Sequence, residues 1–355
     1  MKIAPVMAAL DEMDDVDQRL VHTGQHYDAN MSLVFIEDLG IPHPDVMLGV
    51  RSGTHGAITG RMLIELERVF IELRPDCVVV VGDVDSTMAG ALAAVKLGIP
   101  CAHVEAGLRS FDRAMPEEVN RVVTDRVADL LFTPSADSDR NLLAEGVNEA
   151  AIHRVGNVMI DTLVTHLERA KQRPALANLS LAPGAYALAT LHRPANVDDP
   201  KVLEALLGVI EWIQTQLPVV LPLHPRTKKR LEEFSLTRRA ASMPNLRLTD
   251  PLGYLDFLAL TASAKVVLTD SGGLQEETTV LGVPCLTLRT YTERPVTVSV
   301  GSNTVVGPNP EKIRDAVEQV LSGRGKTGSI PELWDGRSGG RIAAILTERL
   351  AGRPA

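Results

Sequence analysis

The sequence predicts an α/β protein made of two Rossmann-like domains that face each other across a cleft. Short apolar runs rich in valine, isoleucine and leucine alternate with helical patterns along the whole chain. The runs are apolar on both faces, which is typical of parallel strands covered by helices on both sides. A length of 355 residues fits two domains of ordinary size.

The expected domains are an N-terminal domain over residues 1–160, a second domain over 161–337, and a C-terminal helix, 338–355, packed on the N-terminal domain. The apolar runs that predict strands in the first domain are 19–23, 77–81, 99–104, 130–133 and 152–155. Those in the second domain are 186–191, 219–222, 246–248, 265–269 and 284–288. Ligands of such sheets bind at the carboxyl ends of strands, so the residues just after each strand are the functional candidates.

The chain opens on a helical pattern. Ile3, Val6, Met7 and Leu10 recur at helical spacing within residues 1–14. A doubly wound domain ordinarily opens on a strand and a phosphate-binding turn. We therefore expect the first strand of the N-terminal domain to be missing from this chain.

Composition argues against several classes of protein. The net charge is −9, from 36 basic and 45 acidic residues, and aromatic residues make up 3%, which does not suit nucleic-acid binding. The three cysteines, Cys77, Cys101 and Cys285, lie in apolar runs, as expected of reduced core residues. No apolar run approaches the length of a membrane span, so we expect a cytoplasmic protein without a membrane partner.

Three carboxylates are candidate acid/base groups. Asp83 follows the strand 77–81, Glu105 emerges where the next strand ends, and Glu117 opens a helix twelve residues later. We expect them to come from three successive strand-end loops of one sheet. Carboxylates gathered at one edge can divide the roles of acid and base.

Simpler interpretations of the same residues remain open. Asp83 and Asp85 could only solubilise a loop, or could form an Asp-x-Asp metal site, although no histidine stands at coordinating spacing. Glutamates at a helix start are often only a favourable N-terminus. Ser86 or Thr87 is expected to cap the helix 88–97.

The second domain carries a pattern suited to a diphosphate. The strand 265–269 runs into Ser271, Gly272 and Gly273 at a helix start, where free backbone N–H groups and the helix dipole favour phosphate. One turn later, Glu277 could accept hydrogen bonds from ribose hydroxyls. Two further candidates follow other strands: His192 comes directly after the strand 186–191, and Arg294 comes after the strand 284–288.

No cofactor is expected. No G-x-G-x-x-G or P-loop pattern follows a strand, so nothing in the sequence supports a nicotinamide-dependent reaction.

Ordered sequence blocks resemble those of the non-hydrolysing UDP-N-acetylglucosamine 2-epimerase family, which has the glycosyltransferase-B fold. The blocks are Thr23–Asp28, Gly82–Asp83, His103–Arg109, Pro116–Arg121, Gly156–Asn157, Leu191–Arg193, Asp270–Glu277 and Thr292–Pro295. They cover nearly the whole chain.

The resemblance implies an epimerisation at carbon 2 of the sugar. UDP leaves carbon 1 by anti elimination as the carbon 2 proton is lost, and UDP returns to the 2-acetamidoglucal to give UDP-N-acetylmannosamine. The catalytic residues implied are Asp83, Glu105, Glu117 and His192, the last at the leaving phosphate. The substrate-binding residues implied are Lys2, Phe257 at the uracil, Ser271, Gly272, Gly273, Glu277 and Arg294. A homodimer that acts on a UDP-sugar is expected.

The chain departs from the family pattern in two places. Family members begin with a strand and a Gly-Thr-Arg-Pro-Glu loop; here Lys2 aligns after that loop and the arginine is missing. Gln25 and His26 match an allosteric substrate site, but Gly53-Thr54-His55 replaces the second glutamine of that site. The alternatives are a glycosyltransferase of the same fold, an enzyme that epimerises and then hydrolyses, a UDP-diacetamido-glucuronate 2-epimerase, and an inactive nucleotide-binding remnant.

Overall fold

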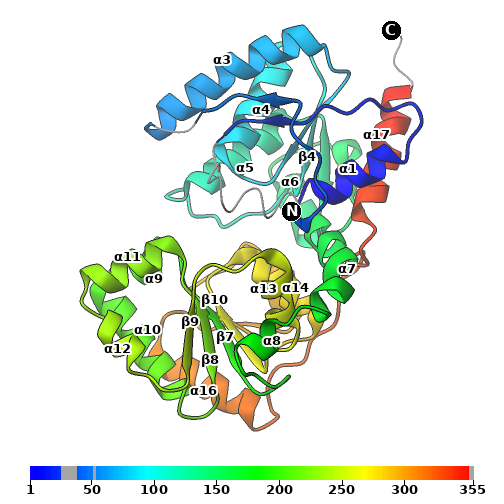
Figure 1. The fold of residues 1–355 in the computed structure, drawn as a ribbon. Helices are drawn as coiled ribbons and strands as arrows, with labels where there is room; N and C mark the ends of the chain where they lie inside the picture. The colour runs from blue at the N-terminus through cyan, green and yellow to red at the C-terminus, as the bar shows by residue number, and fades with distance from the viewer. Residues whose placement is uncertain (25–37, 51–52, 352–355) are drawn as a thin grey trace. The chain divides into compact units, whose positions relative to one another are not determined.

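The computed structural model describes residues 1–24, 38–50 and 53–351, which form two compact units. Unit 1 consists of residues 1–165 and 332–355, and unit 2 consists of residues 166–331 (Figure 1). Unit 1 is therefore discontinuous, because its last segment returns to it after unit 2.

Unit 1 contains a parallel four-stranded sheet and a small parallel pair. The sheet has the order β3-β4-β5-β6, and the pair joins β1 to β2. The strands are β1 (Val21–His22), β2 (Val46–Met47), β3 (Val78–Val81), β4 (Cys101–Val104), β5 (Leu130–Thr133) and β6 (Ile152–Arg154). Because all neighbours are parallel, the carboxyl ends of these strands meet at one edge.

Helices cover both faces of this sheet. Successive side chains of β4 point to opposite faces, and both sets are buried. Ala102 and Val104 pack with Val6 and Ile342, whereas Cys101 belongs to a separate core on the other face. The helices are α1 (Ala4–Asp11), α3 (His55–Leu73), α4 (Asp85–Lys96), α5 (Pro116–Val127), α6 (Ala136–Ala144), α7 (Val158–Lys171) and α17 (Ser338–Ala351), with a 3₁₀ turn, η1, at Glu149–Ala151. The first and last helices, α1 and α17, lie side by side (Figure 1).

Unit 2 contains a parallel six-stranded sheet of order β12-β11-β10-β7-β8-β9. Its strands are β7 (Ala187–Thr190), β8 (Val219–Pro222), β9 (Leu246–Thr249), β10 (Val266–Thr269), β11 (Cys285–Thr287) and β12 (Asn303–Val305). The chain order reverses between β7 and β10, which are neighbours in the centre. Open parallel sheets bind ligands at such a switch point.

The helices of unit 2 also cover both sheet faces (Figure 1). One face packs on α10 and α16, with Leu207 and Ile313 in the same buried core as Ala189 and Leu268. The helices are α8 (Ala175–Asn178), α9 (Pro194–Val197), α10 (Pro200–Ile213), α11 (Pro225–Glu233), α12 (Thr237–Ala241), α13 (Tyr254–Ala262), α14 (Gly272–Leu281), α15 (Pro295–Ser299) and α16 (Pro310–Leu321). Within the described ranges, no helix is long and apolar enough to cross a bilayer.

The α/β class and the parallel sheets predicted from the sequence are confirmed. Two strands, β2 and β12, were not predicted, because each has only two or three residues and no long apolar run. The opening helix is shorter than the predicted 1–14, since it begins at Ala4 with Pro5 in its first turn.

The predicted cap of α4 was wrong. The helix begins at Asp85 after Val84, which has no side chain that could cap it. The Thr87 hydroxyl instead donates back to the carbonyl of Val81 at the end of β3, 2.8 Å away. Thr87 therefore ties the helix to the strand before it.

Candidate active site

The end of β3 and the end of β4 bring Asp83 and Glu105 to the same edge of the unit 1 sheet. Both turns leave the strand sharply: Gly82 has φ +77° and Glu105 has φ +73°. A Cβ on Gly82 would lie 3.2 Å from Lys2 Nζ and 3.4 Å from Glu105 Oε2. Glycine at this position therefore allows the backbone to approach an ion pair closely.

That ion pair joins Lys2 to Glu105. The ammonium contacts the Glu105 carboxylate, whose side chain is 4% exposed, whereas Lys2 is 28% exposed. Lys2 thus lies beside one of the candidate acid/base groups. A cation beside a buried carboxylate offsets much of the cost of removing that charge from water.

Glu117 and Glu118 lie in the first turn of α5, as predicted, with Pro116 as the first residue of the helix. One expectation needs correction, because Glu105 and Glu117 both belong to the connection between β4 and β5. The three candidate carboxylates therefore come from two strand ends. Glu117 is half-buried, whereas Glu118 is buried.

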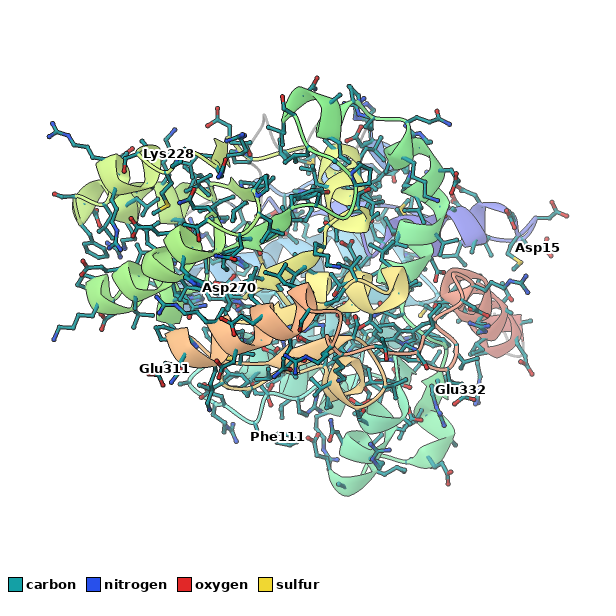
Figure 2. All side chains as sticks on the ribbon, turned by 90° about the horizontal axis from the view of Figure 1, so that it is seen from below. Asp15, Phe111, Lys228, Asp270, Glu311 and Glu332 are labelled. Carbon is teal, nitrogen blue, oxygen red and sulfur yellow. The ribbon has the colours of Figure 1, made fainter. Side chains whose placement is uncertain are left out.

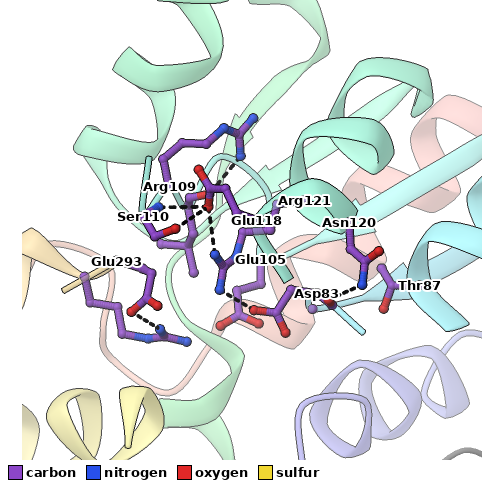
Figure 3. Close-up of polar contacts among 12 residues, drawn as sticks. Asp83, Thr87, Glu105, Arg109, Ser110, Glu118, Asn120, Arg121 and Glu293 are labelled. Carbon is purple, nitrogen blue, oxygen red and sulfur yellow. Dashed lines mark hydrogen bonds and ion pairs between the residues drawn. The ribbon is translucent and has the colours of Figure 1, made fainter. Parts of the chain in front are cut away.

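The next turn of α5 holds the residues around Asp83 (Figure 3). Arg121 donates to Asp83 Oδ2 at 2.5 Å and to Glu118 Oε2 at 2.9 Å. The side-chain amide of Asn120 donates to the carbonyl of Asp83 at 3.0 Å and to Asp85 Oδ1 at 3.1 Å. Asp83 and Asp85 thus interact with polar groups of the same helix.

A buried ionic cluster lies beneath this edge. His103 Nε2 is 2.8 Å from the carbonyl of Gly82, and His103 Nδ1 is 2.6 Å from Asp125. Asp125 also accepts from Arg109 at 2.6 Å and from the backbone N–H of Gly107 at 3.0 Å. Burial raises the pKa of Asp125, but the charges and hydrogen bonds of His103 and Arg109 outweigh burial, so that the pKa lies below its usual range. The cluster fixes the turns that carry Asp83 and Glu105.

In unit 2, His192 is oriented by Asp270. The Asp270 carboxylate is fully buried and lies 2.7 Å from His192 Nδ1. It also accepts from the backbone N–H groups of His192 and Arg193, both at 2.9 Å, and from the side-chain amide of Asn196 at 3.1 Å. Burial raises the pKa of Asp270, but these hydrogen bonds, led by the one from His192, bring it below its usual value. The ionised Asp270 accepts a hydrogen bond from the Nδ1–H of His192, which leaves Nε2 as the ring nitrogen that faces a ligand.

The N-terminus of α14 has the predicted form, with Ser271 as the N-cap and Gly272 as the first helical residue. A Cβ on Gly272 would lie 2.4 Å from Nη1 and 2.8 Å from Cζ of Arg294. The guanidinium therefore packs directly on this glycine. A cation and the positive end of a helix dipole meet here, which is favourable for a bound anion.

Two buried carboxylates hold Arg294 at this place. Glu276 accepts from Arg294 Nε at 2.7 Å, and Glu293 lies 3.7 Å from Nη1. Glu293 is also paired with Arg289 through two hydrogen bonds of 2.9 and 2.7 Å. Burial raises the pKa of Glu293, but the hydrogen bonds and charges of the two arginines outweigh it and bring the pKa to about 2. Glu293 therefore stays charged over the physiological range.

Glu277 lies in a different environment, on the same helix. Burial, aided by the charge of Glu276, raises the pKa of Glu277 to about 7, although the hydrogen bond from Tyr254 acts in the opposite direction. The Tyr254 hydroxyl is 3.2 Å from Glu277 Oε1. Phe257 is half-buried one turn further along α13. The predicted ribose and uracil residues are thus found on two helices that contact each other, α14 and α13.

The two candidate allosteric residues, Gln25 and His26, lie outside the described residues. In the part of the chain that the structure describes, no three histidine, cysteine or acidic side chains come together as a group that could hold a metal ion. The three cysteines are free and at least partly buried.

Sequence reasoning missed the partners of the candidate residues. Arg121, Asp125 and Asp270 all contact or orient them, yet none was selected as a site residue. The i, i+3 spacing of Glu118 and Arg121 on a helix was a usable signal for an ion pair. The position of Asp270 directly after a central strand was a second signal.

The sequence model of the UDP-N-acetylglucosamine 2-epimerase family matches residues 8–347. A UDP-N-acetylglucosamine 2-epimerase of Methanocaldococcus jannaschii is 46% identical over 352 residues, which cover 98% of this chain and 95% of that protein. A UDP-2,3-diacetamido-2,3-dideoxy-D-glucuronate 2-epimerase of Pseudomonas aeruginosa is 43% identical over 354 residues, with 99% and 96% covered.

Solved structures agree with these relatives. The M. jannaschii UDP-GlcNAc 2-epimerase in complex with UDP-GlcNAc and UDP matches with a TM-score of 0.90 and 45% identity, over 98% of this chain and 96% of that one. The Neisseria meningitidis enzyme bound to UDP-GlcNAc matches with a TM-score of 0.84 and 29% identity, over 99% and 96%.

Fold and site together define an α/β enzyme of the two-domain glycosyltransferase-B class. The candidate carboxylates are on unit 1, and the Ser-Gly-Gly start of α14 is on unit 2. Within that class, the chain belongs to the UDP-N-acetylglucosamine 2-epimerase family.

Proposed function

We propose that the protein converts UDP-N-acetylglucosamine to UDP-N-acetylmannosamine by elimination and re-addition of UDP. The observation that carries the proposal is the guanidinium of Arg294 packed on Gly272 at the N-terminus of α14. A guanidinium held by Glu276 and Glu293 and a helix N-terminus offer N–H donors at one point. Such donors suit the diphosphate of the substrate and the UDP that must be retained while the sugar is an intermediate. Names of the relatives agree with this substrate.

The reaction balances without an added co-reactant. As the carbon 2 proton is removed, the carbon 1–oxygen bond breaks, and the carbon 2–hydrogen electron pair forms the double bond of 2-acetamidoglucal. UDP leaves with the electron pair of the carbon 1–oxygen bond. In the second half, UDP adds back to carbon 1 and a proton is delivered to the opposite face of carbon 2.

Acid/base groups for both faces come from unit 1 in this proposal. Asp83, Glu105 and Glu117 are the candidates, and general acid/base catalysis of this kind contributes about 10²–10⁴-fold in rate. Lys2 contacts Glu105 and would compensate negative charge beside it.

Nucleotide binding falls to unit 2. Ser271, Gly272 and Gly273 would offer backbone N–H groups to the diphosphate, and Arg294 would add a charged donor. His192, whose Nδ1–H is held by Asp270, would donate from Nε2 to the leaving phosphate when the ring carries a proton on both nitrogens. Glu277 would accept from the ribose hydroxyls, and Phe257 would pack on the uracil.

Proton NMR with UDP-N-acetylglucosamine in deuterated water tests the proposal. We expect UDP-N-acetylmannosamine to form with deuterium at carbon 2, and substrate recovered at equilibrium to carry deuterium there too. Product without deuterium would contradict the elimination. Free N-acetylmannosamine would show a hydrolysing enzyme, and UDP release only in the presence of an acceptor would show a glycosyltransferase.

A second substrate is favoured by one comparison, the 43% identity to a UDP-2,3-diacetamido-2,3-dideoxy-D-glucuronate 2-epimerase. The same NMR assay with that sugar nucleotide decides between them. We expect kcat/KM to be higher for UDP-N-acetylglucosamine, and a reversed ratio would reassign the substrate. A homodimer and a cytoplasmic location remain predictions; light scattering and cell fractionation test them.

A further inference from the structure

The feature that carries the inference is Arg121, whose side chain is 3% exposed and joins two carboxylates. One acceptor, Asp83, follows a strand of the sheet, and the other, Glu118, lies one turn earlier on the same helix as Arg121. Only one of these two carboxylates is a candidate acid/base group. The other has a different set of contacts.

Glu118 is occupied by four hydrogen bonds. Its Oε2 accepts from the backbone N–H of Ser110, the hydroxyl of Ser110 and Arg121, each at 2.9 Å, and its Oε1 accepts from the backbone N–H of Phe111 at 2.9 Å. A buried carboxylate engaged on both oxygens is poorly placed to exchange a proton with a substrate. Glu118 is therefore a fixed anchor for Arg121.

The anchor also fixes an unusual segment of backbone. Phe111 has φ +59°, and the residue is 74% exposed at the surface (Figure 2). A non-glycine residue with positive φ is uncommon and is maintained only where its surroundings impose it. Here the N–H bonds to Glu118 impose it, so the loop after Glu105 and the Asp83 turn are held by the same ion network.

We propose that Arg121 is the positioning residue of the Asp83 carboxylate, with Glu118 as its anchor. The inference rests on the proposed function, because Asp83 needs a fixed position only if it takes part in proton transfer. A misplacement of about 1 Å of a catalytic group costs on the order of 100-fold in rate. Arg121 prevents such movement through hydrogen bonds to both carboxylates.

The geometry requires arginine. The planar guanidinium presents two N–H groups to two acceptors at a fixed spacing, whereas a lysine ammonium is a single flexible point charge. A lysine ammonium presents its N–H groups from a single nitrogen, so it would not reproduce the separate contacts that Nη1 makes with Glu118 and Nη2 makes with Asp83. A positive charge alone is therefore insufficient to hold both carboxylates in place.

Steady-state kinetics of Arg121→Lys, Arg121→Ala and Glu118→Gln test the inference. We expect Arg121→Lys to lower kcat by about 100-fold while KM changes by less than about threefold. The reason is that the substitution displaces the Asp83 carboxylate and leaves the proposed substrate-binding groups in place. Guanidinium ion at millimolar concentration should restore part of the kcat of Arg121→Ala. Arg126→Lys is the matched control, since Arg126 is exposed on the same helix, and it should keep the parent kcat.

The outcomes separate the inference from the proposed function. A parent enzyme that forms no epimer overturns the proposed function. An active parent whose Arg121→Lys variant keeps its kcat overturns only the role of Arg121. A loss of kcat that guanidinium does not restore, accompanied by a matching fall in melting temperature, would show that Arg121 serves the fold alone and would equally overturn the inference.

Discussion

At the scale of single residues, the candidate site is defined by how each charge is compensated. Asp83 is paired with Arg121, and Glu105 is paired with Lys2. His192 is held by a fully buried Asp270. Each of these three candidates therefore has a partner that fixes its position, which favours efficient proton transfer or phosphate binding.

Substitution of the candidate carboxylates gives the first prediction. Asp83→Asn, Glu105→Gln and Glu117→Gln should each lower kcat by roughly 100-fold or more, because each removes a proton acceptor while its shape is kept. Binding of UDP, measured by calorimetry, should change little. If one of the three variants keeps near-parental turnover, the carboxylate replaced in it has a structural role.

Glu277 gives a prediction about pH. Its pKa of about 7 lies above the ordinary value of 4.5. Between these two pH values, Glu277 of the folded protein without ligand is protonated, whereas Glu277 of the unfolded chain is ionised. Its contribution to stability is therefore fully present below pH 4.5 and is lost as the pH rises through about 7. Ribose hydroxyls need the ionised carboxylate, so affinity for UDP-N-acetylglucosamine should rise from pH 6 to pH 8.

Calorimetric titrations at several pH values check this expectation. The sugar nucleotide is a suitable ligand, because its diphosphate is a diester and keeps its charge over this range. Glu277→Gln should bind more weakly and show a flatter pH dependence. An equally steep dependence in that variant would place the titrating group elsewhere.

At the scale of elements, the strand-to-helix turns carry most of the site. Parallel strands end at one edge, and glycine occurs where the backbone passes close to a charged side chain, as at Gly82 and Gly272. Lys228 on α11 and Glu311 on α16 are, in contrast, exposed on unit 2 (Figure 2). They have no role in the proposed chemistry.

Gly272 allows a direct test at this scale. A methyl group at this position would lie 2.4 Å from Arg294 Nη1, so Gly272→Ala should displace the guanidinium from the helix N-terminus. We expect UDP affinity to fall by roughly 10-fold or more, since one charge-assisted hydrogen bond contributes about 1.5–3 kcal/mol. Gly60→Ala is the control, because a Cβ on Gly60, which lies within α3, would meet nothing within 4 Å. Unchanged UDP affinity in Gly272→Ala would remove the phosphate from this turn.

The sequence predicted the elements better than their partners. Strands such as 130–133 and 219–222 were predicted to the residue, because they are apolar runs bounded by clear turns. The start of α14 was predicted, since Ser-Gly-Gly directly after a strand is typical of a strand-to-helix turn. The pairing of Arg121 with Asp83 could not be predicted, because it depends on how α5 lies against the β3 turn, 38 residues away in sequence. The same holds for Asp270 and His192, which are 78 residues apart.

At the scale of the whole molecule, the proposed chemistry is divided between the two units. In the proposed function, unit 1 would supply the carboxylates, and unit 2 would supply the groups that bind the nucleotide. UDP at 100 times its Kd should add about 2.7 kcal/mol to the free energy of unfolding. Hydrogen exchange with bound UDP should slow at the N-terminus of α14, while α1 and α17 should be unaffected. Slower exchange confined to unit 1 would contradict this division.

The discontinuous path of unit 1 has a consequence for biosynthesis. α17 supplies Ile342 and Leu346 to the core that contains Val6, yet the ribosome adds α17 only after all of residues 166–331. At about 5–20 residues per second, that interval lasts on the order of 8–30 s. During this time the nascent N-terminal segment leaves an apolar face of α1 uncovered, which is the kind of surface that chaperones hold. Nascent chains stalled before α17 should therefore be more sensitive to protease within α1 than released chains, and equal sensitivity would show that α1 is protected without its partner.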